Sequence, residues 1–437
     1  MAVVVSAVLS ASLATAQTTW IDGSPIQTRL RVGADGTTYV GVWIDAPNRV
    51  VTRTRAPMAI SLVVDTSGSM AGDKIQNARL AAASLLESAA DGDIVSIYAF
   101  SNGVTEMAPP TVVSAATRAS LMQRVGQLYA AGGTNLYGGV QAGLSRLSQV
   151  PNTHPVRRVF LISDGHANIG PSDSYSLSAL AAGGTEWGAQ ISAIGVGLDY
   201  DQQSLSAMVV RSSGRLYHLQ QPQQMATILE QEMSLLSRTV AVNAFIEVVP
   251  APGVTILEGN TTGAEVVNGR LRLPLGSVFS GQHREVLFRA RVDTAQPGSR
   301  SLAQARLVYQ SPGEERALTE ETTLRYEVTR DEAAARASQA PTVVAMVADH
   351  RATEAQHRAA EMMRSGQQDQ AARELATARA TLAAAAQAAP AAPSSARLRS
   401  RAQQMERAEQ RAATAAPSEA PAAAYDFEDD AMSAEGY

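Results

Sequence analysis

Short apolar runs alternate with longer amphipathic stretches between Met58 and Arg238, and this alternation constrains the fold more than any other feature. Residues 58–64 form a nearly continuous apolar run, which is expected for a strand that is buried on both faces. Residues 74–90 follow with apolar side chains at helical spacing. This alternation predicts an α/β fold with a doubly wound, mainly parallel sheet. Further strands are expected at 93–100, 158–163, 191–196 and 215–219, and further helices at 117–128, 136–147, 201–213 and 223–237.

The segments on either side of this unit have the two-residue period of strands with one buried face. Residues 27–46 alternate around a turn at 33–36, which predicts a hairpin of two strands. After Arg238, Asn268-Gly269 is a hairpin signal. The strands expected there lie at 244–249, 271–275, 286–292, 302–309 and 323–328.

Right-handed crossovers bring both ends of the α/β unit to the side opposite the carboxyl ends of its strands. We therefore expect the unit, residues 57–238, to be inserted in or followed by one β-sandwich. That sandwich would be built from residues 17–56 and 239–329. The alternative is that the first hairpin packs on the α/β sheet alone.

The two ends of the chain differ from its middle. Residues 330–413 are rich in alanine and predict a helical region, and the acidic residues 414–437 predict a disordered tail. An apolar run before Ala14-Thr15-Ala16 predicts a signal peptide at 1–16, and hence a secreted, periplasmic or cell-surface protein. No basic segment precedes this run, which leaves open a start codon farther upstream. No transmembrane segment is expected in the mature chain.

Composition removes several classes of chemistry. The chain has no cysteine, which excludes disulfide scaffolds, thiolate zinc sites and thiol nucleophiles. Lys74 is the only lysine, and it is not part of a phosphate-binding loop. The formal net charge of -5 argues against nucleic acid as a partner.

Three polar loops are expected to meet at the carboxyl ends of the buried strands, where open α/β sheets bind ligands. The first is Asp65-Thr66-Ser67-Gly68-Ser69, and a near-extended loop would point its first, third and fifth side chains to one side. The second loop, 132–135, offers Thr134, and the third, 162–165, offers Asp164. The candidate metal ligands are therefore Asp65, Ser67, Ser69, Thr134 and Asp164.

Carboxylate and hydroxyl oxygens suit Mg²⁺, with Mn²⁺ or Ca²⁺ as alternatives. A divalent ion would also relieve the repulsion between the two carboxylates. Because few protein ligands are anionic, the ion would keep net positive charge and an open position. Such a site favours an Asp or Glu carboxylate supplied by a partner protein.

Residues 57–238 resemble a von Willebrand factor type A (VWA) domain, and the resemblance implies that these five residues form its metal-ion-dependent adhesion site. In that family the hydroxyls usually touch the metal, while one or both aspartates can act through water. Ser163 departs from the threonine of many relatives, but it is not a ligand position. The flanks resemble secreted bacterial VWA proteins related to inter-alpha-trypsin inhibitor heavy chains. The motifs that carry the resemblance are 63–70, 74–75, 91–96, 99–101, 132–135, 161–165 and 194–197.

The function predicted from these features is non-enzymatic binding of a protein partner through a divalent ion. One alternative is a VWA subunit that works with an ATPase in a bacterial assembly. Another is a metal-dependent hydrolase, although the matched motifs contain no general base. The sequence leaves the oligomeric state, the metal and the partner's identity open.

Overall fold

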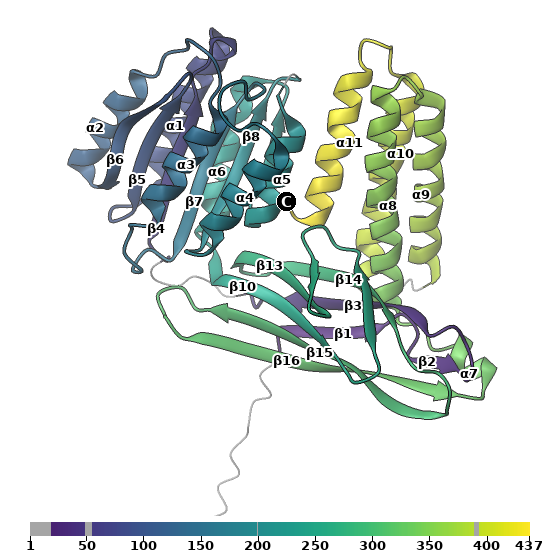
Figure 1. The fold of residues 1–437 in the computed structure, drawn as a ribbon. Helices are drawn as coiled ribbons and strands as arrows, with labels where there is room; N and C mark the ends of the chain where they lie inside the picture. The colour runs from purple at the N-terminus through teal and green to yellow at the C-terminus, as the bar shows by residue number, and fades with distance from the viewer. Residues whose placement is uncertain (1–18, 49–54, 199, 389–392) are drawn as a thin grey trace, which may run out of the picture.

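The computed structural model describes residues 19–48, 55–198, 200–388 and 393–437, so the predicted signal peptide lies outside the described residues. An α/β unit, a β-sandwich and a helical bundle lie next to one another (Figure 1). The predicted fold class is confirmed. None of the helices in the described ranges is long and apolar enough to cross a bilayer.

The α/β unit contains a six-stranded sheet in the order β6-β5-β4-β7-β8-β9. Every neighbouring pair is parallel except β5 and β6, which run antiparallel at one edge. The central strands are buried along their whole length, as their apolar runs predict. The strands are β4 (Met58–Asp65), β5 (Ile94–Phe100), β6 (Val104–Val112), β7 (Val156–Ser163), β8 (Ala189–Val196) and β9 (Arg215–Leu219).

Helices cover both faces of this sheet (Figure 1). Successive residues of β4 point to opposite faces, so Leu62 packs in the core with α1 and α6, while Val63 packs in the core with α3 and α5. The helices are α1 (Asp73–Ser88), α2 (Ala115–Gly126), α3 (Leu136–Leu147), α4 (Ser174–Thr185), α5 (Gln202–Ser212) and α6 (Met225–Leu236).

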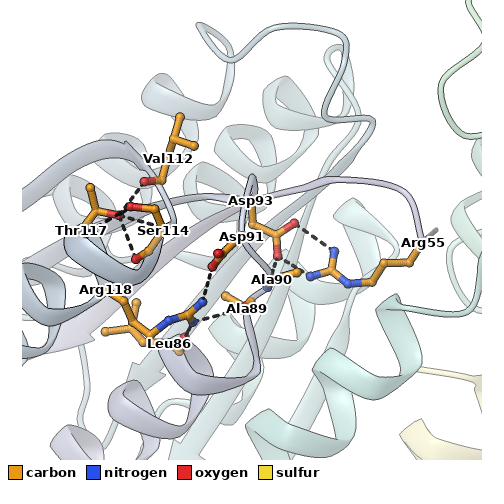
Figure 2. Close-up of polar contacts among 10 residues, drawn as sticks. All are labelled: Arg55, Leu86, Ala89, Ala90, Asp91, Asp93, Val112, Ser114, Thr117 and Arg118. Carbon is orange, nitrogen blue, oxygen red and sulfur yellow. Dashed lines mark hydrogen bonds and ion pairs between the residues drawn. The ribbon is translucent and has the colours of Figure 1, made fainter.

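Asp93 fixes the start of the central strands β4 and β5, at the end of the sheet opposite the polar loops. Figure 2 shows its contacts with Arg55 and Ala90. Its buried carboxylate accepts hydrogen bonds from the backbone N–H of Met58 and of Ala90, both at 2.9 Å. It also pairs with the guanidinium of Arg55. These bonds fix the position of Met58, the first residue of β4. They therefore also help to fix the position of Asp65, the last residue of the same strand.

The sandwich has one sheet in the order β1-β3-β14-β11 and a second in the order β12-β13-β10-β15-β16-β2. β3, which precedes the α/β unit, pairs with β14, which follows it, from Thr37↔Arg291 to Asp45↔His283. The strands are β1 (Ile21–Pro25), β2 (Arg29–Arg31), β3 (Thr37–Asp45), β10 (Thr239–Pro250), β11 (Thr255–Gly259), β12 (Glu265–Val267), β13 (Arg270–Phe279), β14 (His283–Arg291), β15 (Gly298–Gln310) and β16 (Ala317–Thr329).

The hairpin expected at 27–46 is wrong. β3 pairs instead with β1, in the register Ile21↔Ile44, and β2 joins the other sheet parallel to β16. The chain leaves β1 because Gln27 bridges to Gln339 and the N–H of Thr28 donates to the carbonyl of Ser338. Alternating apolar residues show that a strand has one buried face, but they do not select its partner.

Four helices form a bundle around a core rich in alanine and leucine (Figure 1). The acidic tail that was expected to be disordered is one of them, α11, so that prediction is wrong. Apolar residues on one side of α11, among them Phe427 and Met432, are buried against the bundle and the α/β unit, which stabilises the helix despite its charge. The helices of this region are α7 (Glu332–Arg336), α8 (Pro341–Arg364), α9 (Gln368–Ala388), α10 (Pro393–Thr414) and α11 (Ala420–Glu435).

Candidate metal centre

Asp65 is the last residue of β4, and its carboxylate is fully buried. One oxygen, Oδ1, accepts a hydrogen bond from the backbone N–H of Ser67 at 2.8 Å. The other, Oδ2, accepts from the hydroxyl of Ser163 at 2.6 Å. Ser163 therefore orients Asp65 from the neighbouring strand β7, a role that its position in the sequence did not reveal.

The loop after Asp65 is not near-extended as expected. Ser67 is the N-cap of a short 3₁₀-helix, η1 (Gly68–Met70), which turns the chain back over the strand end. The turn still brings the hydroxyls of Ser67 and Ser69 to 3.0 Å from each other. Ser69 then donates a hydrogen bond to Oδ1 of Asp164 at 2.7 Å. Four of the five candidate ligands are thus joined by a continuous series of hydrogen bonds.

Thr134 reaches the same place on a loop that is bonded to the first one. The N–H of Gly68 donates to the carbonyl of Gly132 at 3.0 Å, and Gly132 has the left-handed φ of 86° that this approach requires. A Cβ atom at Gly165 would lie 3.5 Å from Ser69 Oγ and 3.8 Å from Thr134 Oγ1. The hydroxyls of Thr134 and Ser69 therefore border the same glycine.

Two asparagines hold the Thr134 loop in position, and neither was singled out from the sequence. Asn168 accepts a hydrogen bond from the N–H of Thr134 at 2.8 Å, and Asn102 accepts from the N–H of Gly133 at 2.6 Å. A lone asparagine in a loop carries no sequence signal for this role, because the two partners are 34 and 31 residues apart.

Lys74 supplies a positive side chain that pairs with one of the carboxylates. Its ammonium group donates to Asp164 Oδ2 at 2.5 Å, and the Asp164 side chain is fully buried. Burial raises the pKa of the Asp65 carboxyl, and the charge of Asp164 raises it further, while hydrogen bonds from Ser163 and Ser67 oppose the shift. The site therefore holds two buried carboxylates and one partly exposed ammonium group.

The donor set fits a hard divalent cation. Within the described residues, no three His, Asp or Glu side chains are grouped so as to hold a metal ion, so an imidazole or all-carboxylate centre is not formed there. Two carboxylates and three hydroxyls are oxygen ligands of the kind that Mg²⁺, Mn²⁺ and Ca²⁺ bind.

Residues 60–166 match the family model of the von Willebrand factor type A domain. A von Willebrand factor type A structure from Catenulispora acidiphila superposes with a TM-score of 0.72, is 16% identical and covers 96% of this chain and 97% of that one. The chain therefore contains a VWA domain, the class that the resemblance predicted, and VWA domains are commonly metal-dependent protein-interaction modules.

Several curated relatives match parts of the chain. The uncharacterized protein sll0103 of Synechocystis is 24% identical over 59% of this chain and 63% of its own length. Inter-alpha-trypsin inhibitor heavy chain H3 of Mesocricetus auratus is 29% identical over 36% of this chain and 18% of its own length. The match to this chain thus covers about three fifths of the first relative and less than a fifth of the second.

Proposed function

We propose that this protein binds a partner protein through a divalent ion held by Asp65, Ser67, Ser69, Thr134 and Asp164. Mg²⁺ is the expected ion, with Mn²⁺ or Ca²⁺ as alternatives. The ion, when bound, supplies positive charge and an open coordination position. The ligand that fits this position is an Asp or Glu side chain of the partner.

The observation that carries the proposal is the series of hydrogen bonds from Asp65 through Ser67 and Ser69 to Asp164. It converges at the carboxyl ends of β4 and β7, where α/β sheets bind ligands. Ser163 and Asn168 keep the surrounding oxygens oriented.

The charge of the site favours an anionic ligand over storage of metal. A divalent ion is balanced by the two carboxylates, and Lys74 adds one more positive charge beside Asp164. The loaded site would therefore have net positive charge, which attracts a carboxylate. With the predicted signal peptide, this supports a non-enzymatic binding protein of the cell envelope or extracellular space.

The test is calorimetric titration of Mg²⁺ into the whole chain and its Asp65→Ala variant. We expect the variant to lose binding at least about tenfold. Its circular dichroism spectrum should be unchanged, because Asp65 ends β4 and its carboxylate bonds to polar groups of Ser67 and Ser163 rather than packing in the apolar core. Asp73→Ala is the matched control, since Asp73 is exposed in the first turn of α1. Equal Mg²⁺ affinity in the parent and Asp65→Ala would refute the site.

The partner's chemistry is tested separately, with the Mg²⁺-loaded chain and a library of peptides that carry a single acidic residue. Binding that disappears when the acid is replaced by its amide, and when the metal is chelated, is the expected result. Binding of acid and amide peptides with equal affinity would contradict the carboxylate ligand and leave the metal site intact.

A further inference from the structure

Three arginines line one cavity at the base of the α/β unit, where this unit contacts the sandwich. Arg158 lies on β7 and Arg215 on β9, while Arg284 lies on β14 of the sandwich. We call these three residues the arginine cluster. They line one small cavity together with Ser213, Gly214, Leu275, Ser277, Phe279, Gln282 and Gly436.

The positive charge around this cavity exceeds the negative charge. Arg158 and Arg215 both face the carboxylate of Glu232 on α6, each at 3.9 Å. Glu232 is already engaged, because it accepts hydrogen bonds from Ser192 at 2.7 Å and from Tyr217 at 2.6 Å. Arg284 donates to the carbonyl of Gly436 and lies over the ring of Tyr437. No acidic side chain is among the described residues that line the cavity.

Arg158 shows the imbalance most directly. Its side chain is 2% exposed, and it donates one hydrogen bond, at 3.3 Å, to the hydroxyl of Ser192. Its Nε–H has no hydrogen-bond partner within the described residues. Burial lowers the pKa of Arg158 and of Arg284, and the charge of Arg215 adds to both shifts. Glu232 opposes the shift at Arg158, and Tyr437 and Glu435 oppose it at Arg284. A buried charge without adequate pairing is costly, so a counter-ion at this position would be strongly stabilising.

The size of the cavity selects the kind of anion. About 10 Å³ of this cavity is open to the centre of a water-sized particle, so the cavity has room for one such particle and little more. Phosphate and sulfate carry four oxygens and are too large, whereas a halide is a single atom. We propose that the arginine cluster binds one chloride ion between the α/β unit and the sandwich.

The position of the ion gives it a structural consequence. An anion there would be shared by strands of both units, β7 and β9 on one side and β14 on the other. Two of its three arginines also face Glu232 of α6, the helix that closes the VWA domain. Chloride would therefore hold the sandwich against the base of the α/β unit and support the position of α6.

The direct test is diffraction from crystals of the whole chain grown with sodium bromide, with data collected at the bromine absorption edge. We expect an anomalous peak between the three guanidinium groups. A water molecule there, with no anomalous signal, overturns the proposal. This measurement needs no variant.

The solution test compares thermal unfolding in chloride with unfolding in gluconate at the same ionic strength, which removes general salt effects. We expect a saturable stabilisation by chloride and bromide in the parent chain. Arg284→Gln should weaken the apparent halide affinity by roughly 10- to 100-fold, as for the loss of one hydrogen bond to a charged group.

Arg289→Gln is the matched control, because Arg289 is on the same strand but its side chain is 39% exposed and paired with Glu258 at the surface. This control should keep the response of the parent. Equal halide responses in the parent and Arg284→Gln would overturn the proposal, as would the absence of a halide response in the parent.

Discussion

The ion pair between Lys74 and Asp164 sets the net charge of the proposed metal site. Replacing Lys74 by methionine removes a cation that repels the metal, so we expect Mg²⁺ affinity to rise roughly tenfold by calorimetry. The same change removes positive charge from the loaded site, so affinity for an acidic peptide should fall. Lys74→Arg keeps the charge and should behave like the parent. Unchanged or weaker Mg²⁺ binding in Lys74→Met would contradict this account.

Asp93 allows a second prediction for a single side chain, at the opposite end of the sheet (Figure 2). Asp93→Ala leaves the Arg55 guanidinium and two backbone N–H groups without their acceptor. We expect a loss of roughly 3–5 kcal/mol in the free energy of unfolding, measured by urea denaturation. Asp91→Ala is the control two residues away, since the Asp91 side chain is 69% exposed and its pair with Arg118 should contribute less than about 1 kcal/mol. Similar losses of unfolding free energy in the two variants would show that Asp93 does not fix the start of β4.

The residues of the candidate site could be predicted from the sequence, but their connections could not. Each candidate ligand stands in a short loop after a strand or before a helix, so local pattern was enough to select it. Lys74 and Ser163 lie in the same motifs, yet their partners Asp164 and Asp65 are 90 and 98 residues away. Such a contact depends on strand order, which β4 and β7 acquire only when the sheet forms.

Among the elements, those with a strong apolar period were predicted and those without it were missed. β6 is an exposed edge strand that contains Pro109-Pro110, so it lacks the apolar run of its neighbours. α4 is built largely from serine, alanine and glycine, which give little contrast between its two sides. In α6, which was predicted as a helix, the apolar residues Met225, Leu229 and Met233 are buried at helical spacing. The buried Glu232 among them was not predicted, because its partners lie on β7, β8 and β9.

The contact between α11 and the α/β unit contains titratable groups from both sides, and Asp429 of α11 and His218 of β9 have opposite effects on the pH dependence of this contact. Burial raises the pKa of Asp429, which accepts a hydrogen bond from the backbone of His218, from 3.8 to about 6. Burial lowers the pKa of His218 from 6.5 to about 4, and its ring stacks on Tyr425 at 4.8 Å. Because the pKa of Asp429 is raised, this group makes α11 docking less stable as the pH rises from about 4 to 6. Because the pKa of His218 is lowered, that group makes docking more stable as the pH rises from about 4 to 6.5.

The variant Asp429→Asn isolates the carboxyl contribution. The stability of α11 docking in the parent, relative to this variant, should fall by up to about 3 kcal/mol as pH rises from 4 to 6. Hydrogen exchange of the α11 amides measures this difference, with Glu419→Gln as a control at the exposed residue that precedes the helix. A difference between parent and Asp429→Asn that is independent of pH would rule out titration of Asp429 in the interface. Asp426, Asp430 and Glu435 also have raised pKa values, but they are present in both proteins.

For the whole molecule, the topology makes the sandwich depend on chain segments that are far apart in the sequence. β14 lies between β3 and β11, so removing the N-terminal segment would leave one full side of β14 without its partner. A fragment of residues 239–329 would therefore expose a long sheet edge and the apolar residues Val286 and Phe288, which are fully buried in the intact chain. We expect this fragment to be insoluble or unfolded, while residues 57–238 alone fold.

The decisive version of this prediction keeps all the strands and removes the inserted unit. The chain enters the α/β unit after Ala56, which packs against the core that contains Met58 and Leu236. It returns to the sandwich at β10, immediately after α6. Replacing residues 57–238 by a short Gly-Ser linker should therefore leave the strand pairing of both sheets possible, since loop closure adds little cost for a short flexible connection. Dispersed amide resonances in the linker protein, and their absence in the 239–329 fragment, are the expected pair of NMR results. A well-folded 239–329 fragment would contradict the insertion, because it would mean that β1, β2 and β3 are dispensable to the sandwich.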